Sequence, residues 1–119
     1  GRVVAVCSAQ PGSGVTTVAS ALAFALKATD KAASVALAEP GTGVPELALA
    51  LNVTPANGLD QLLRLSERAD ASMARSAAVD HAAGVSVLAY TAETLAPEPV
   101  TAEQARRLVT VLRAGYDWV

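Results

Sequence analysis

Along this chain, short uninterrupted apolar runs alternate with segments in which apolar side chains recur every three or four residues. The runs are rich in valine, which is typical of strands buried on both faces of a sheet. They predict strands at 2–7, 34–38 and 85–89, and the start of a fourth at 116–119. Helical spacing predicts helices at 16–28, 45–51, 59–63, 67–78 and 101–115. This alternation indicates an α/β fold in which helices cover a parallel sheet on both faces.

The last of these helices carries the clearest end signals. Thr101 and Gln104 have the spacing of a capping box, and Gly115 follows the last apolar position. Glu103 and Arg107 are four residues apart, so they form an ion pair on the surface of the helix. In the first helix, the apolar face that the spacing predicts consists of Val18, Leu22, Ala25 and Leu26.

Composition fits one small domain. The chain has 119 residues, of which 52% are hydrophobic and 17% charged, and this excludes a disordered segment. With only 3% aromatic residues, the core must consist mainly of valine, leucine and alanine. The net charge of −2 gives no general attraction to nucleic acid or anionic lipid, so no nucleic-acid partner is expected.

Cysteine usage and hydropathy place the chain in a reducing, aqueous compartment. Cys7 is the only cysteine, so no internal disulfide can form, and we expect its side chain to be a small buried apolar group. No stretch approaches the roughly 20 uncharged apolar residues of a membrane span. The first residues lead directly into a strand and do not resemble a signal peptide. These features predict a cytoplasmic protein without a membrane span.

Residues 9–17 read Ala-Gln-Pro-Gly-Ser-Gly-Val-Thr-Thr and join the first predicted strand to the first predicted helix. Strand, glycine-bearing turn and helix start are the context of a phosphate-binding loop, because free backbone N–H groups and the helix dipole converge there. Gly12 and Gly14 let the main chain bend closely around an anion. Thr16 occupies the place from which such loops reach Mg²⁺ with a hydroxyl.

The loop departs from the usual G-x-x-x-x-G-K-[ST] pattern at two positions. Val15 stands where the pattern has lysine, and Ala9 where it has glycine. No catalytic residue is assigned, and Thr16 is the predicted metal ligand. The predicted nucleotide-binding residues are Gly12, Ser13, Gly14, Val15, Thr16 and Thr17.

Each of these features also has a purely structural interpretation. The glycines could form a plain strand-to-helix turn, and Thr16 and Thr17 could be ordinary residues of a first helical turn. Glu39, after the second predicted strand, is either a solvated carboxylate or part of a metal site. His81 has no second ligand at metal spacing and is predicted to lie on a surface loop.

The loop resembles the deviant Walker A motif of the ParA/MinD ATPase superfamily, whose usual form is G-K-G-G-x-G-K-T-T. Gly12, Gly14, Thr16 and Thr17 match this form, and both lysines are absent. Loops with an apolar residue in place of the second lysine are typical of the CpaE/TadZ branch. Further blocks follow the order and spacing of that branch, so the resemblance covers nearly the whole chain: 35–39, 46–51, 58–63, 84–89 and 116–119.

The resemblance implies a P-loop NTPase-like fold of which residues 1–119 are a single partial ATPase domain, its first half. Within the family, one lysine neutralises phosphate inside the subunit and the other reaches across a dimer; Val15 and Gln10 can do neither. If each lysine makes one charge-assisted hydrogen bond worth about 1.5–3 kcal/mol, the loss of both weakens phosphate binding by roughly 3–6 kcal/mol. Glu39 and Gly41 replace the family's Asp-x-Asp.

The resemblance therefore implies a degenerate ATPase domain that binds ATP and Mg²⁺ weakly or not at all and hydrolyses little ATP. Its implied role is a localisation or scaffold module for Flp/tad-type pilus assembly. The implied partners are other pilus-assembly and secretion proteins, and the implied location is the cell pole or the inner membrane surface. Formation of a homodimer is also possible within this family. The alternative is an active ParA/MinD-type spatial-positioning ATPase, which the retained glycines and Thr16 and Thr17 keep open.

Overall fold

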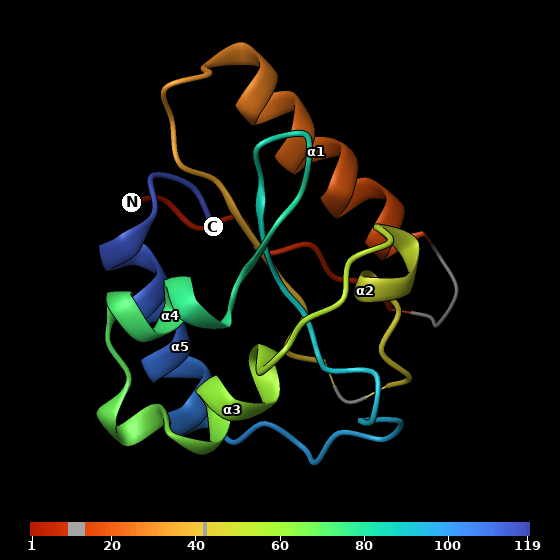
Figure 1. Cartoon of the computed structure of the whole chain (residues 1–119), viewed down its shortest axis with the longest axis vertical. Coiled ribbons are helices and arrows are strands. Elements are labelled where there is room, and N and C mark those ends of the chain that lie inside the picture. Colours follow the sequence, from red (N-terminus) through yellow and green to blue (C-terminus); the bar gives the residue numbers. More distant parts are fainter. Residues whose placement is uncertain (10–13, 42) are drawn as a thin grey trace.

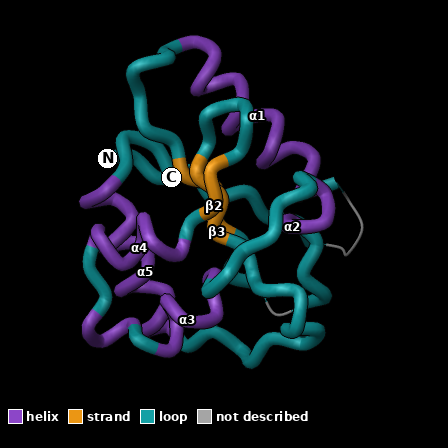
Figure 2. The backbone as a smooth tube through the Cα atoms, viewed as in Figure 1, coloured by secondary structure: helices purple, strands orange, loops and turns teal. Residues whose placement is uncertain are grey.

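The computed structural model describes residues 1–9, 14–41 and 43–119, and these form an α/β fold. Figure 1 shows the helices and Figure 2 the short strands between them. The described elements are, in chain order, α1 (Val15–Thr29), β1 (Ala36–Ala38), α2 (Leu47–Ala50), α3 (Gly58–Arg64), the 3-10 helix η1 (Ser66–Arg68), α4 (Ala71–Ala77), β2 (Val79–Asp80), β3 (Ser86–Leu88) and α5 (Ala102–Gly115). The predicted fold class is confirmed at this level.

The sheet is small and mixed, with the order β1-β3-β2. β1 and β3 are parallel, as predicted, whereas β2 pairs with β3 in the antiparallel direction. The prediction of a wholly parallel sheet is therefore wrong. A tight turn produces the antiparallel pair: the Gly84 N–H donates to the His81 carbonyl, and Gly84 has a φ of 88°, which favours glycine.

Two isolated parallel bridges, Arg2↔Trp118 and Val35↔Trp118, continue the pairing beyond β1. The Arg2 N–H donates to the Asp117 carbonyl over 2.8 Å, and the Ala36 N–H donates to the Trp118 carbonyl over 2.9 Å. Residues 117–119 thus lie between the first residues of the chain and β1. The strands predicted at 2–7 and 116–119 are present as single bridges rather than as extended strands.

Buried side chains form two clusters, and alternate residues of the strands contribute to each. Leu88 belongs to the cluster formed with α3, α4 and α5, whereas its neighbour Val87 belongs to the cluster with Ala23 of α1. In Figure 1, α1 lies on one side of the strands and α3, α4 and α5 lie on the other. β1 and β3 thus have helices against both of their faces, whereas β2, at the edge of the sheet, is half-buried at Val79 and exposed at Asp80.

The first apolar run differs from its prediction. Residues 2–7 were expected to be fully buried, yet Val3 is 41% and Val4 45% exposed, and Cys7 is also exposed. The reason lies in the pairing: the described backbone hydrogen bonds of Arg2 and Val4 all run to residues 117 and 119, on one side of the run. The side chains of Val3 and Val4 instead border an open cavity.

α1 has the predicted extent but buries a different face. Ser20 and Ala23 are its buried residues, whereas Val18 is 56% and Leu22 39% exposed. Because α1 carries apolar side chains on most of its circumference, their spacing alone could not identify the face that packs against the sheet. The small side chains of Ser20 and Ala23 allow a close approach to the strands.

The remaining helices follow the local signals in the sequence. The predicted helix at 67–78 is divided into η1 and α4, because Asp70 adopts an extended conformation and its carboxylate accepts the Met73 N–H over 2.8 Å as a new helix cap. α5 begins at the predicted capping box of Thr101 and Gln104. None of the helices in the described ranges is long and apolar enough to cross a membrane.

Candidate functional site

The candidate site is the N-terminal end of α1 together with the residues that follow β1. Gly14 caps α1 with a φ of 85°, and its carbonyl accepts the Val18 N–H over 2.9 Å. A Cβ at Gly14 would meet no atom within 4 Å, so the left-handed backbone is the reason for glycine here. Two of the predicted binding residues, Gly12 and Ser13, lie outside the described residues.

The other predicted residues lie on the first turn of α1. Val15 and Thr16 are half-buried, whereas Thr17 is exposed. The Thr16 Oγ1 donates a hydrogen bond to Oε2 of Glu46 over 3.3 Å. The hydroxyl predicted to bind Mg²⁺ is thus bonded to a carboxylate that lies 30 positions further along the chain.

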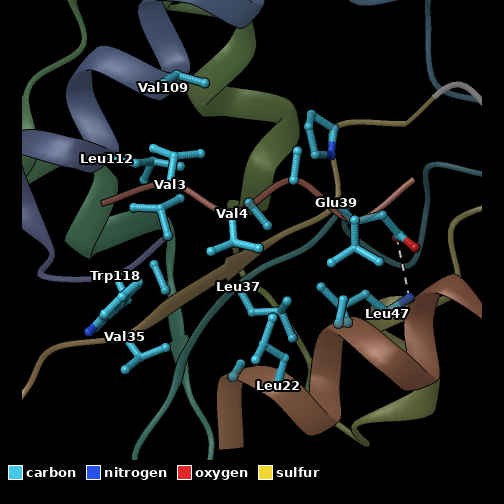
Figure 3. A pocket seen from close by; sticks show the side chains of 18 of the residues that line it. Val3, Val4, Leu22, Val35, Leu37, Glu39, Leu47, Val109, Leu112 and Trp118 are labelled. Atoms are coloured by element: carbon cyan, nitrogen blue, oxygen red, sulfur yellow. Dashed lines mark hydrogen bonds between the residues drawn. The ribbon is translucent and has the colours of Figure 1, made fainter. Parts of the chain in front are cut away.

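Glu39 occupies the end of β1 and holds the start of α2. Its carboxylate accepts the backbone N–H groups of Glu46 and Leu47, each over 3.2 Å. Figure 3 shows the Glu39 side chain directed toward Leu47. Burial raises the pKa of the Glu39 carboxyl above its ordinary value, the N–H groups of Leu47 and Glu46 lower it, and repulsion from the Glu46 carboxylate raises it further. Glu39 is therefore a half-buried carboxylate that accepts backbone N–H groups at the start of α2.

A hydrogen bond from Tyr90 fixes the segment after Glu39. The Tyr90 hydroxyl donates to the Gly41 carbonyl over 3.2 Å, which ties this segment to the residues that follow β3. Burial raises the pKa of Tyr90, and the negative charges of Asp60 and Glu39 contribute. Asp60 itself accepts the Thr91 N–H over 2.8 Å and a hydrogen bond from Thr94. The carboxyl ends of β1 and β3 are thus held together.

The site carries two carboxylates, and the lysines of the chain lie far from it. Lys27 is near the other end of α1, about 16 Å from Thr16 at 1.5 Å per residue. Its ammonium group donates to the carbonyls of Lys31 and Ala33 over 2.8 and 2.7 Å. Within the described ranges, no lysine or arginine forms an ion pair with Glu39 or Glu46, and no cluster of three His, Cys, Asp or Glu side chains could hold a metal ion.

A cavity of about 420 Å³ opens beside this site, between the first residues of the chain, α1, β1 and α5. Figure 3 shows Val3 and Val4 between α5 and α1, with Leu22, Leu37 and Leu112 around them. Of the described lining residues, only Thr16, Glu39 and Trp118 carry a polar side-chain atom. The cavity therefore has one polar end, at Thr16 and Glu39, and an otherwise apolar wall.

Sequence reasoning missed the role of Glu46 and the anchoring by Tyr90. No local pattern marks Glu46, because its contact with Thr16 depends on the packing of α2 against α1. The prediction for His81 is correct in part: it lies in the turn between β2 and β3, where its Nδ1 accepts the Ala83 N–H, but it is half-buried, with its ring 5.0 Å from that of Phe24.

Comparison with known proteins gives no independent assignment. The chain matches no known family profile. No curated protein is significantly similar to it either. The function must therefore be inferred from the motif at residues 9–17, the spacing of the later blocks and the geometry around Thr16, Glu39 and Glu46.

Proposed function

We propose that this chain is a degenerate ATPase domain of ParA/MinD type that serves as a localisation or scaffold module in Flp/tad-type pilus assembly. The observation that carries the proposal is the start of α1: a left-handed Gly14 leads into a helix whose Thr16 hydroxyl donates to the Glu46 carboxylate. Among the residues that the structure describes, no lysine or arginine pairs with Glu46 or with Glu39, which holds the Glu46 backbone. The glycine and the hydroxyl are those of a phosphate-binding loop, whereas its positive charges are missing.

The position of the start of α1 relative to the strands supports a P-loop-like origin. Residues 2–4 run parallel to residues 117–119, which run parallel to the segment that enters β1. The described start of α1 therefore lies near the carboxyl end of this first run, on the same cavity as Glu39, which follows β1. Ligands of open α/β sheets bind at the carboxyl ends of the strands.

The charges around the turn support weak nucleotide binding. A carboxylate about 5 Å from a phosphate oxygen costs roughly 3 kcal/mol at an effective dielectric constant of 20. With Glu46 bonded to Thr16, Glu39 bonded to the Glu46 N–H and no lysine in the loop, bound phosphates would meet repulsion that the N–H groups at the start of α1 offset only in part. A domain of this kind binds its partners through its surface without being cycled by ATP hydrolysis.

An active spatial-positioning ATPase is the second candidate. The left-handed Gly14 and the accessible first turn with Thr16 and Thr17 favour it, because these are the parts of the loop that hold phosphate through the backbone.

Thermal unfolding with Mg–ATP, together with an ATPase assay, separates the two candidates. A ligand at 100 times its dissociation constant adds about 2.7 kcal/mol of stability, which a thermal scan resolves. We expect little stabilisation at millimolar Mg–ATP and little hydrolysis. Turnover at rates typical of ParA/MinD enzymes would refute the degenerate assignment.

The scaffold role has its own test. A fluorescent fusion of the protein in cells that assemble Flp/tad pili should form foci at the assembly site. These foci should persist when Thr16 is changed to alanine, because localisation does not require nucleotide turnover. A diffuse signal for the unmodified fusion would contradict the scaffold role.

A further inference from the structure

The first residues of the chain form a free edge of the sheet. The N–H groups of Arg2 and Val4 donate to residues 117 and 119, each over 2.8 Å. Backbone groups of successive residues in an extended chain point to opposite sides, so those of Val3 and Ala5 point away from residues 117–119. In the part of the chain that the structure describes, the backbone groups of Val3 and Ala5 form no hydrogen bond.

This edge is accessible and lies between two helices. Val3, Val4 and Ala5 are exposed, and Figure 3 shows Val3 and Val4 between α5 and α1. Two further exposed apolar side chains, Leu22 of α1 and Val109 of α5, line the same cavity. Half of the large apolar side chains that are exposed in the described residues therefore line this one cavity.

An edge of this kind accepts one more strand. The backbone of an added strand satisfies the unpaired N–H and C=O groups, and these main-chain hydrogen bonds supply affinity. Apolar side chains of α1 on one side and of α5 on the other line the space beside the edge. Both faces of an added strand would meet apolar surface, and strands covered on both faces are continuous apolar runs. The partner that fits is therefore an extended, uncharged segment rich in β-branched residues.

The edge has these properties itself. Residues 3–6 read Val-Val-Ala-Val, without a charge and with three β-branched side chains. The opposite edge of the sheet does not have them, because β2 is only two residues long and includes the exposed Asp80. Pairing of residues 3–6 with the same residues of a second copy satisfies the free groups of both chains at once, and a two-fold axis relates such equal surfaces.

We infer that two copies of this chain pair in the antiparallel direction through residues 3–6 and join their sheets. The two-fold axis passes between the two Val4 residues, one from each copy. In this register Val3 of each copy lies opposite Ala5 of the other, and each such pair exchanges both of its N–H···O bonds. All four free N–H groups of the two edges thereby find acceptors.

Charge and the amino terminus favour this register over its neighbours. Arg2 of each copy lies opposite Val6 of the other, so no like charges are directly opposed. A register with Val3 opposite Val3 would instead place Ala5 opposite Gly1. The amino group of Gly1 already donates to the Arg113 carbonyl over 2.7 Å.

The first test is the oligomeric state of the complete 119-residue chain without nucleotide, measured by sedimentation equilibrium. We expect a mass near twice 12.0 kDa. Val4→Lys should raise the dissociation constant of the dimer at least about tenfold, because two ammonium groups then lie opposite each other. The matched control is Val44→Lys, since Val44 is also exposed and lies outside the described lining of the cavity. Circular dichroism verifies that each variant is folded.

The second test examines the register by crosslinking. Directly opposed residues of a non-hydrogen-bonded antiparallel pair have Cα atoms about 4.5 Å apart, which is within the range of a disulfide. Val4→Cys in a Cys7→Ser background should therefore form a disulfide-linked dimer when oxidised glutathione accepts the two electrons. Val44→Cys in the same background should form little of this product.

Several results would overturn the inference. A monomeric wild type at submillimolar concentration would do so, as would a Val4→Lys variant that dimerises as tightly as wild type. An equal loss of dimer in Val44→Lys, no crosslink at Val4, or equal crosslinking in the two cysteine variants would also contradict it. Neither the pairing nor its tests involve nucleotide, so this inference and the proposed function can fail separately.

Discussion

Replacing Val15 with lysine should restore part of the missing phosphate affinity. Val15 is the first residue of α1 and the position at which the phosphate-loop pattern has its lysine. One charge-assisted hydrogen bond to phosphate is worth about 1.5–3 kcal/mol. At 1.4 kcal/mol per factor of ten, the variant should bind Mg–ATP roughly 10- to 150-fold more tightly than wild type.

The control for this experiment is Val18→Lys. It adds the same charge to the same helix, but Val18 is 56% exposed and is not among the residues that line the cavity. Mg–ATP affinity and thermal stability without ligand are measured for both variants. Equal affinity in the two would refute the assignment of Val15 to the lysine position.

A different result would refute the electrostatic part of the reasoning. If Val15→Lys raised the stability of the free protein but left the affinity unchanged, the new ammonium group would be paired with Glu39 or Glu46 rather than available to phosphate. The proposal of a loop that lacks only its cation would then fail, because adding one would not restore binding.

Three further predictions concern stability. Leu112→Ala should lower the free energy of unfolding, measured in urea, by about 2–5 kcal/mol, since Leu112 is 2% exposed. The control Leu49→Ala, at a position that is 88% exposed, should change it by less than about 0.5 kcal/mol. Similar losses in both variants would contradict the packing of α5. Thr101→Ala should cost about 1 kcal/mol in the same assay, because it removes the hydroxyl that accepts the Gln104 N–H, and an unchanged midpoint would refute that cap. Because the pKa of Glu39 is raised in the folded state, the folded protein binds more protons than the unfolded chain over the pH range just above the ordinary value of 4.5. The contribution of Glu39 to stability should thus increase as the pH falls from 7 toward 4.5, and Glu39→Gln should lose this increase in pH-dependent urea titrations; identical pH profiles would contradict the burial of that carboxylate.

Local signals in the sequence predicted the elements whose boundaries depend on neighbouring residues. α5 starts as predicted because Thr101 and Gln104 cap it through the backbone within one helical turn, and it ends at the predicted Gly115, after which Tyr116 is extended. The position of β1 was also predictable, since an apolar run ends at Glu39 and Pro40. In these cases the physical cause lies within a few residues of its effect.

The features that the sequence did not reveal depend on contacts between distant residues. β2 is only two residues long, so it has no periodicity to detect, and its pairing follows from the turn at Gly84. The buried face of α1 is selected by the strands that it meets. At the site, Gly14 and Thr16 were found from their spacing, whereas the Thr16–Glu46 contact arises only when α2 packs beside α1.

The position of residues 117–119 between residues 2–4 and β1 has a consequence for the order of folding. The described backbone bonds of Arg2 and Val4 run to Asp117 and Val119, near the other end of the sequence. During synthesis the first apolar run leaves the ribosome long before these partners exist, and closing so large a loop slows the pairing. Valines 3 and 4 therefore lack these partners while β1 and β3 are being synthesised, and a chaperone that recognises short apolar segments has access to them in that interval.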